Sequence, residues 1–218
     1  MSIKEDAMSI IKRAKELERE GYEDYSAYTI AADEILNVRG GGRLMEDINK
    51  RQIYLDAFID TNHKIDKSER LEFKLSWLLT KISELANKDA WFKYCKEKDT
   101  LAYSKRYEEA SDCLHLFVSL AHEIGVVIVE PNTNYYYQAK EPDDSKDFVY
   151  RSECYKNILR NLSLIDKRNS TYENSMLLLR GFDNYIRFLF SIGLRWDDVK
   201  KAYVDKNIKN LKLQLNYK

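Results

Sequence analysis

The sequence predicts an all-α protein, and three observations support this prediction. The 218 residues include only two prolines and seven glycines, so long helices meet few residues that would break them. Apolar residues recur at helical spacing along most of the chain. Hydrophobic residues make up 44% of the chain, which is enough for one sizeable core, alone or with an appendage.

The first segment, residues 3–36, is charged and carries apolar side chains such as Ile10 and Leu17 at helical spacing. Gly40–Gly42 follow and break any helix, so we expect a hinge or loop there. A phosphate-binding loop is the alternative, but the stretch lacks the Gly-Lys-Ser/Thr ending and a preceding strand. We therefore expect a helical appendage over residues 1–45.

Residues 46–218 are expected to form one helical domain. Two breaks in its pattern stand out. Ser68 is a plausible N-cap for the helix that follows it, and the stretch 126–150 holds both prolines and a β-branched run. We expect this stretch to be an irregular insertion, with a short strand or hairpin as an option. Helical periodicity covers residues 47–65, 69–88, 106–125, 152–168, 172–194 and 195–218.

The predicted core is drawn from the large apolar side chains that repeat along these helices and would pack as a bundle. They are Leu75, Leu78, Leu79, Ile82, Leu85, Leu114, Phe117, Val118, Ala121, Met176, Leu179, Phe188 and Phe190.

The composition argues against several functional classes. Lys+Arg and Asp+Glu balance at 36 each, which gives no global field to attract nucleic acid or an anionic membrane. The N-terminus shows no apolar run typical of a signal peptide. Cys95, Cys113 and Cys154 form no Cys-x-x-Cys pair and are expected to be buried small hydrophobic residues. We expect a cytoplasmic protein without a nucleic-acid or membrane partner.

Two carboxylates occupy unexpected positions. Glu109 and Asp112 lie on a helical row that continues apolar through Leu116 and Leu120, and an ionised carboxylate facing a core needs a partner or a metal. Glu84, one helix earlier, also sits beside an apolar face, so two helices could bring three carboxylates together. Such oxygen ligands suit Mg²⁺. The alternative is that these acids pair with lysines at helix ends.

His115 and His122 provide a further metal-site hypothesis. It is not favoured, because no third nitrogen or sulfur ligand accompanies them in the pattern. His115 is instead a plausible hydrogen-bond partner of Asp112.

A family resemblance adds to this interpretation. Four segments resemble, in this order, the motifs of the dimeric all-α dUTPases, which belong to the all-α NTP pyrophosphatases with the MazG-like enzymes. The segments are 51–59, 82–94, 108–125 and 192–214, and the similarity covers roughly residues 48–125 and 175–217. The resemblance implies a helical bundle of that type, a homodimer, and hydrolysis of dUTP and dUDP to dUMP with Mg²⁺.

The resemblance also assigns metal positions. The family carries Glu-x-x-Glu on one core helix and Glu-x-x-Asp on the next, which hold Mg²⁺. Glu84, Glu109 and Asp112 match three of the four positions as metal ligands, and Glu84 and Glu109 match the catalytic acids. Lys81 stands at the fourth position, and an ammonium group cannot ligate Mg²⁺. We therefore expect Lys81 to impair turnover.

The remaining matches are nucleotide contacts. Gln52 resembles the glutamine that reads the uracil edge, since an amide offers a donor and an acceptor. Leu213 stands where the family usually shows an arginine. The resemblance places Trp91 and Phe92 around the base, Lys93 at a phosphate, and Tyr203, Lys206, Asn207 and Asn210 near the phosphates and the metal.

These residues leave three interpretations open. The leading one is a dUTP diphosphatase, with residues 1–45 packed outside its nucleotide site. The alternative is a nucleotide-binding or regulatory protein that kept the fold and lost turnover, such as a phage or mobile-element product that engages a protein regulator. The third is a helical scaffold with no nucleotide site, whose melting temperature would not respond to a dUTP analogue with Mg²⁺.

Overall fold

The all-α prediction is confirmed by the computed structural model of the chain, in which the described residues form helices and no strand. The structure describes residues 3–21, 30–31, 33–35, 45–63, 66–93, 103–133 and 144–215. The principal helices are α1 (Ile3–Arg19), α3 (Met45–His63), α4 (Arg70–Asp89), α5 (Tyr103–Ile124), α7 (Asp144–Ser163), α8 (Thr171–Ser191) and α9 (Trp196–Leu215). None of the described helices is long and apolar enough to cross a membrane.

The chain divides into two compact units. One comprises Met1–Asp66 together with Val204–Lys218, and the other comprises Lys67–Tyr203. The first turns of α9 therefore belong to the second unit and the remainder of that helix to the first. The division into an appendage over 1–45 and a domain over 46–218 stays a prediction.

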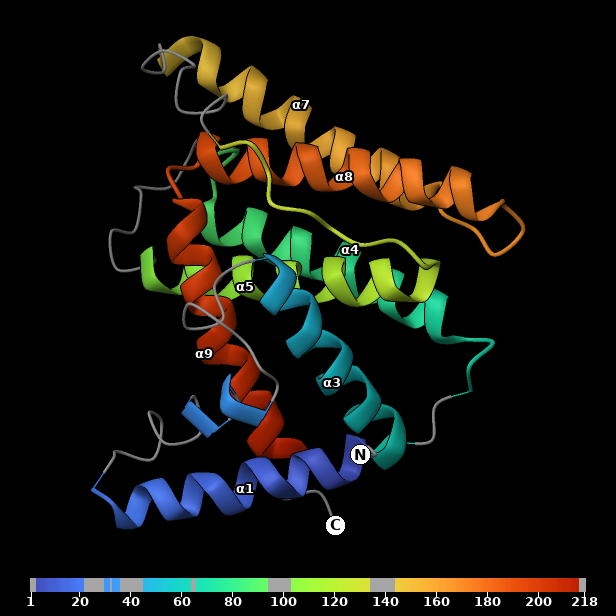
Figure 1. Cartoon of the computed structure of the whole chain (residues 1–218). Helices are drawn as coiled ribbons and strands as arrows, with labels where there is room; N and C mark the ends of the chain where they lie inside the picture. Colours follow the sequence, from blue (N-terminus) through green and yellow to red (C-terminus); the bar gives the residue numbers. More distant parts are fainter. Residues whose placement is uncertain are drawn as a thin grey trace. The chain divides into compact units, whose positions relative to one another are not determined.

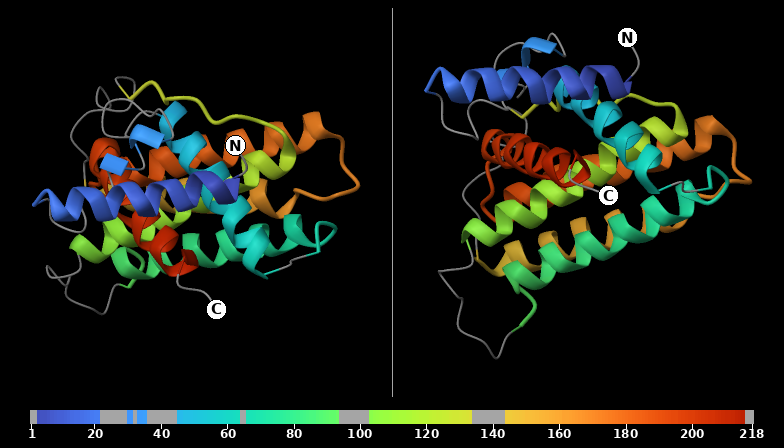
Figure 2. Two further views of the ribbon diagram at one scale, coloured as in Figure 1. Left: turned by 60° about the horizontal axis from the view of Figure 1, so that its bottom comes forward. Right: turned by 90° about the horizontal axis from the view of Figure 1, so that it is seen from below.

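The unit Lys67–Tyr203 is a bundle of α4, α5, α7 and α8. Helix α4 packs along α5, and α7 packs along α8, as Figure 1 and Figure 2 show. Leu78, Ile82 and Leu85 lie three or four residues apart on α4 and are fully buried. This spacing places them on one helical face, and burying each such side chain stabilises the fold by roughly 1.5–3 kcal/mol.

Most of the predicted core is buried. Leu79, Met176 and Phe190 are only partly buried, and the prediction for Leu179 is wrong, since 36% of that residue is exposed. Leu178 is the buried neighbour, and successive helical residues point about 100° apart. The predicted core residues that are buried are Leu75, Leu78, Ile82, Leu85, Leu114, Phe117, Val118, Ala121 and Phe188.

Two helix starts differ in how they are capped. Helix α4 follows Glu69, whose side chain makes no capping hydrogen bond, so the prediction that Ser68 is the N-cap is wrong. Helix α8 begins after Ser170 with a complete capping box: the Ser170 hydroxyl accepts from the Glu173 N–H, and the Glu173 carboxylate accepts from the Ser170 N–H. The Ser-x-x-Glu pattern could have located this second start from the sequence.

The predicted irregular insertion is shorter than expected. Residues 126–133 are irregular and contain no strand, whereas α7 already begins at Asp144. Both prolines precede this helix, where they do not interrupt its hydrogen bonds. Pro142 itself lies outside the described residues.

The other unit contains α1 and α3, which contact each other. Helix α1 buries Ile10, Ala14 and Leu17 in a small cluster with Leu211 of α9. The helix ends at Arg19, so the helical pattern expected over 3–36 is interrupted. Gly21 follows with φ of +96°, a conformation that glycine adopts readily and other residues rarely do.

Candidate functional site

Lys81 lies among the three carboxylates that the sequence singled out. Its Nζ atom is 2.7 Å from Glu84 Oε2, 3.1 Å from Asp112 Oδ2 and 3.4 Å from Glu109 Oε2. Lys81 and Glu84 are neighbours on one face of α4, and the other two acids come from α5, which packs along it. The structure therefore brings the three acids together around an ammonium group. We call these four residues the carboxylate cluster.

The carboxylate cluster is largely shielded from solvent. The Lys81, Glu109 and Asp112 side chains are 19%, 16% and 14% exposed, whereas Glu84 is 43% exposed. Burial raises the pKa of Glu109 even though Lys81 opposes this shift. The hydrogen bond from Lys81 lowers the pKa of the more exposed Glu84. For Lys81 burial acts to lower the pKa, but bonds to Glu84 and Asp112 outweigh it and the pKa is raised.

This arrangement bears directly on the predicted magnesium site. Within the described part of the chain, no group of three or more His, Cys, Asp or Glu side chains is placed to hold a metal ion. Mg²⁺ requires oxygen ligands at about 2.0–2.1 Å in octahedral geometry, and a lysine ammonium has only hydrogens to offer. As they lie, the residues of the carboxylate cluster do not fit Mg²⁺.

A second ion pair joins the same two helices. Lys74 Nζ lies 3.1 Å from Glu123 Oε2 and donates to the Ser119 carbonyl at 3.4 Å. Lys74 precedes Lys81 on α4, whereas its acid on α5 follows those of the carboxylate cluster. Helices α4 and α5 are thus antiparallel, with one lysine of α4 bonded to α5 at each of two levels.

Tyr203 is fully buried and stacks on His115 of α5, with ring centroids 4.0 Å apart and planes inclined by 26°. His115 is one helical turn from Asp112, so Tyr203 supports the helix that carries part of the carboxylate cluster. The sequence predicts His115 as a hydrogen-bond partner of Asp112, whereas its stacking on Tyr203 is not predictable from the sequence.

Trp91 follows the end of α4, where Ala90 takes a left-handed conformation with φ of 56° and donates to the Ala86 carbonyl. Its ring lies edge-on to Phe188 and Tyr155, with centroids 5.1 and 5.6 Å away, so much of it packs inside the bundle. Phe92 is 42% exposed, and Lys93 Nζ lies 5.6 Å from its ring centroid, within cation–π range.

The other predicted nucleotide contacts belong to the unit of α1 and α3. Gln52 on α3 is 3% exposed, and its Nε2 donates to Asp56 Oδ1 at 2.7 Å. Asn207 of α9 is buried, and Lys206 and Asn210 are partly buried. The structure assigns these residues and the carboxylate cluster to different units, so their convergence on one nucleotide stays a prediction.

Two features of this unit were not anticipated from the sequence. Arg51, adjacent to Gln52, is 1% exposed and pairs with Asp33. The sequence shows an arginine next to Gln52, but it does not show that this arginine is buried or which acid it pairs with. Leu213, where the resemblance leads us to expect an arginine, is 67% exposed.

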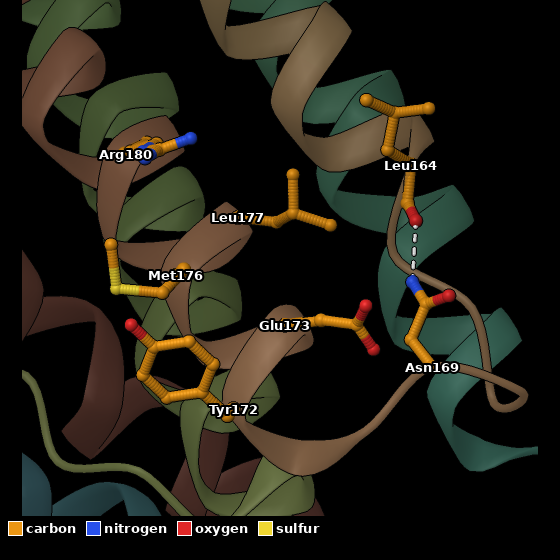
Figure 3. Close-up of a pocket in the computed structure, with 7 residues that line it drawn as sticks. All are labelled: Leu164, Asn169, Tyr172, Glu173, Met176, Leu177 and Arg180. Carbon is orange, nitrogen blue, oxygen red and sulfur yellow. Dashed lines mark hydrogen bonds between the residues drawn. The ribbon is translucent and has the colours of Figure 1, made fainter.

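A shallow pocket lies elsewhere, between the loop after α7 and the first turns of α8. Tyr172, Met176 and Arg180 line it, and Asn169 donates to the Leu164 carbonyl at its edge (Figure 3). None of the predicted site residues lines this pocket. It is therefore a surface feature separate from the carboxylate cluster.

Comparison with known proteins identifies the family. A family model described as dUTPase matches residues 44–217, which is most of the chain. No curated protein and no solved structure gives a significant match. The helical fold agrees with the all-α form of dUTPase. The chain therefore belongs to the all-α dUTPase family.

Proposed function

We propose that this chain binds deoxyuridine nucleotides and hydrolyses dUTP and dUDP to dUMP at a rate limited by Lys81. Family membership over residues 44–217 is the observation that supports nucleotide chemistry. The three acids at family positions, Glu84, Glu109 and Asp112, meet in one place, as such a site requires. A homodimer and a cytoplasmic location are part of the same proposal. Mg²⁺ enters the proposal with the phosphates of the nucleotide, since the carboxylate cluster by itself does not fit the ion.

Within this proposal each residue has a stated role. Glu84 and Glu109 are the catalytic acids, and both are engaged by Lys81. Trp91 forms a wall beside the base, and Lys93 and Lys206 approach the phosphates as point charges. Three further contacts, from Tyr203, Asn207 and Asn210, complete the set.

Gln52 is proposed to read the uracil edge. Its amide is now bonded to Asp56, so a bound base has to replace or share that bond. An amide suits this role because the imide of uracil presents both an acceptor and a donor.

The second candidate is a nucleotide-binding or regulatory protein without turnover, able to engage a protein regulator. The ion pairs of Lys81 favour it, because they satisfy the acids that would otherwise act in hydrolysis. Nucleotide contacts outside the carboxylate cluster would persist in such a protein.

A nucleotide panel tests both candidates. Pyrophosphate release from dUTP, dCTP and dTTP is measured with and without Mg²⁺, alongside the melting temperature with a non-hydrolysable dUTP analogue. A melting shift specific to the deoxyuridine analogue, with turnover well below roughly 1 s⁻¹, is expected. A shift with no turnover at all favours the second candidate, and no response to any nucleotide contradicts both.

Gln52→Ala tests base recognition. Leaving a buried base edge unpaired should weaken binding of the dUTP analogue by about 1–3 kcal/mol. Asn62→Ala removes an amide from the same helix and serves as the matched control, with affinity expected to stay unchanged. Calorimetry measures both. If Gln52→Ala leaves the preference for uracil over purine nucleotides intact, the glutamine does not read the base.

A further inference from the structure

Three carboxylates on facing helices need a cation if they are to stay ionised where they lie. Glu109 and Asp112 are mostly shielded from solvent, and Glu84 lies beside them on α4. Ionised groups in such a place repel one another and lose hydration, so they are held only by compensating positive charge.

Lys81 places one positive charge among the three acids and can donate a hydrogen bond to each of them. A lysine ammonium has three hydrogens to donate, and each of the three carboxylates has one oxygen within 3.4 Å of Nζ. One of these acids is on the helix of Lys81, and the other two are on α5. The ammonium therefore bridges α4 to α5, as a divalent ion shared between two helices would.

We propose that Lys81 is the built-in cation of the carboxylate cluster and joins α4 to α5 in place of a divalent metal ion. The cluster is then complete without metal, and divalent ions do not stabilise the wild-type bundle through it. The inference concerns the site of the proposed function. Its test uses metal without nucleotide, so either can fail while the other holds.

The experiment compares melting temperatures of the full chain after removal of metals, in MgCl₂ and in NaCl of equal ionic strength. Lys81→Met removes the charge and keeps most of the side-chain volume. Lys81→Arg keeps the charge. Lys74→Met is the matched control, because it removes a lysine of similar exposure from the same interface but outside the carboxylate cluster, where Lys74 pairs with Glu123.

The expected result is a magnesium-specific rise of several degrees for Lys81→Met alone. For each of the other three proteins, the melting temperature in MgCl₂ should equal that in NaCl. They are the wild type, Lys81→Arg and Lys74→Met. A Lys81→Met protein that folds only in MgCl₂ would be the extreme form of this result.

Two outcomes would overturn the inference. One is a wild type that Mg²⁺ stabilises as much as it stabilises Lys81→Met, or that binds Mg²⁺ stoichiometrically in calorimetry. The other is a Lys81→Met protein that Mg²⁺ does not stabilise or refold, since a metal then cannot replace the ammonium.

Discussion

Lys74 and Lys81 make a controlled comparison inside one interface. They are seven residues apart, which is about two turns, so both face α5, and their side chains are 18% and 19% exposed. Lys74 pairs with Glu123 and donates to the Ser119 carbonyl, whereas the Lys81 ammonium lies within 3.4 Å of three acids. The Lys74–Glu123 contact is an ordinary interhelical ion pair. The carboxylate cluster, in contrast, carries a net negative charge when its three acids are ionised. The two lysines are alike in exposure and orientation. The acids around each lysine therefore decide whether it forms a simple ion pair or part of a charged cluster.

Among the variants that test this comparison, Lys81→Glu is expected to change metal affinity, turnover and stability the most. It restores the Glu-x-x-Glu spacing and adds a fourth negative charge, so Mg²⁺ affinity should rise and dUTP turnover should increase at least about tenfold, equivalent to about 1.4 kcal/mol in the barrier. In the presence of a chelator, the free energy of unfolding of the variant should fall by about 2–4 kcal/mol, which is less than the loss expected for a fully buried ion pair. Pyrophosphate release across a magnesium titration and urea unfolding measure the two effects.

Lys74→Glu is the control for that variant, since it makes the same charge reversal two turns away. It should lose stability without gaining metal affinity or turnover. No gain in magnesium affinity for Lys81→Glu would show that position 81 does not face the site. A fast wild-type enzyme would show that the motif is misaligned or that another acid substitutes.

Glu123→Gln and Glu109→Gln each remove the charge of one acid, the first beside Lys74 and the second beside Lys81. Glu123→Gln should cost about 1 kcal/mol, because it weakens the ion pair that Lys74 makes across the interface. Glu109→Gln should cost less at pH 7, because Lys81 keeps Glu84 and Asp112 and because burial disfavours ionised Glu109. Urea unfolding in chelator measures both free energies. The reverse order would show that the carboxylate cluster depends on Glu109 more than the Lys74 ion pair depends on Glu123.

The pH dependence of Glu109→Gln has a definite sign. Burial raises the folded-state pKa of Glu109 above its unfolded value of about 4.3, so ionisation of this group destabilises the fold. The wild type should therefore gain stability relative to the variant as the pH falls through the folded pKa, with no further gain below the unfolded one. Unfolding curves at pH 7, 5.5 and 4 measure this gain, and a constant difference would argue against it.

Asp166→Asn should give the smallest effect, because its partner Arg168 is 84% exposed. Hydrogen bonds from Arg168 lower the pKa of Asp166 to about 2, so its contribution is present above the unfolded pKa and is lost as the pH falls through about 2. The melting temperature at pH 7 should change less than for Glu123→Gln, since solvent screens this pair. A larger change would mean that solvent exposure does not determine how much these ion pairs contribute to stability.

Much of the fold was predictable because it depends on local patterns. Few helix breakers and regular apolar spacing were enough to predict all-α structure and most of the bundle core. Some errors concern single positions: Leu179 lies one residue from the buried row of α8, and Ser68 precedes α4 without capping it. Others concern the bounds of segments, since α1 already ends at Arg19 and α7 already begins at Asp144. Periodicity fixes a helical face only to within about one residue.

The carboxylate cluster was predictable because its acids interrupt apolar faces and match a family signature. The surroundings of the aromatic residues were not. Trp91 packs against Tyr155 and Phe188, and Tyr203 stacks on His115, and these partners are more than 60 residues away in the chain. Sequence spacing carries no information about contacts between helices so far apart.

The small cluster of Ile10, Ala14 and Leu17 with Leu211 has a consequence for synthesis on the ribosome. Leu211 follows Leu17 by about 200 residues, which at about 5–20 residues per second is a delay of about 10–40 s. During that time the apolar face of α1 lacks a partner that it buries in the finished protein. The contact of α1 with Leu211 can therefore form only after most of the chain has been synthesised, whereas Ala31 of the same cluster is available much earlier.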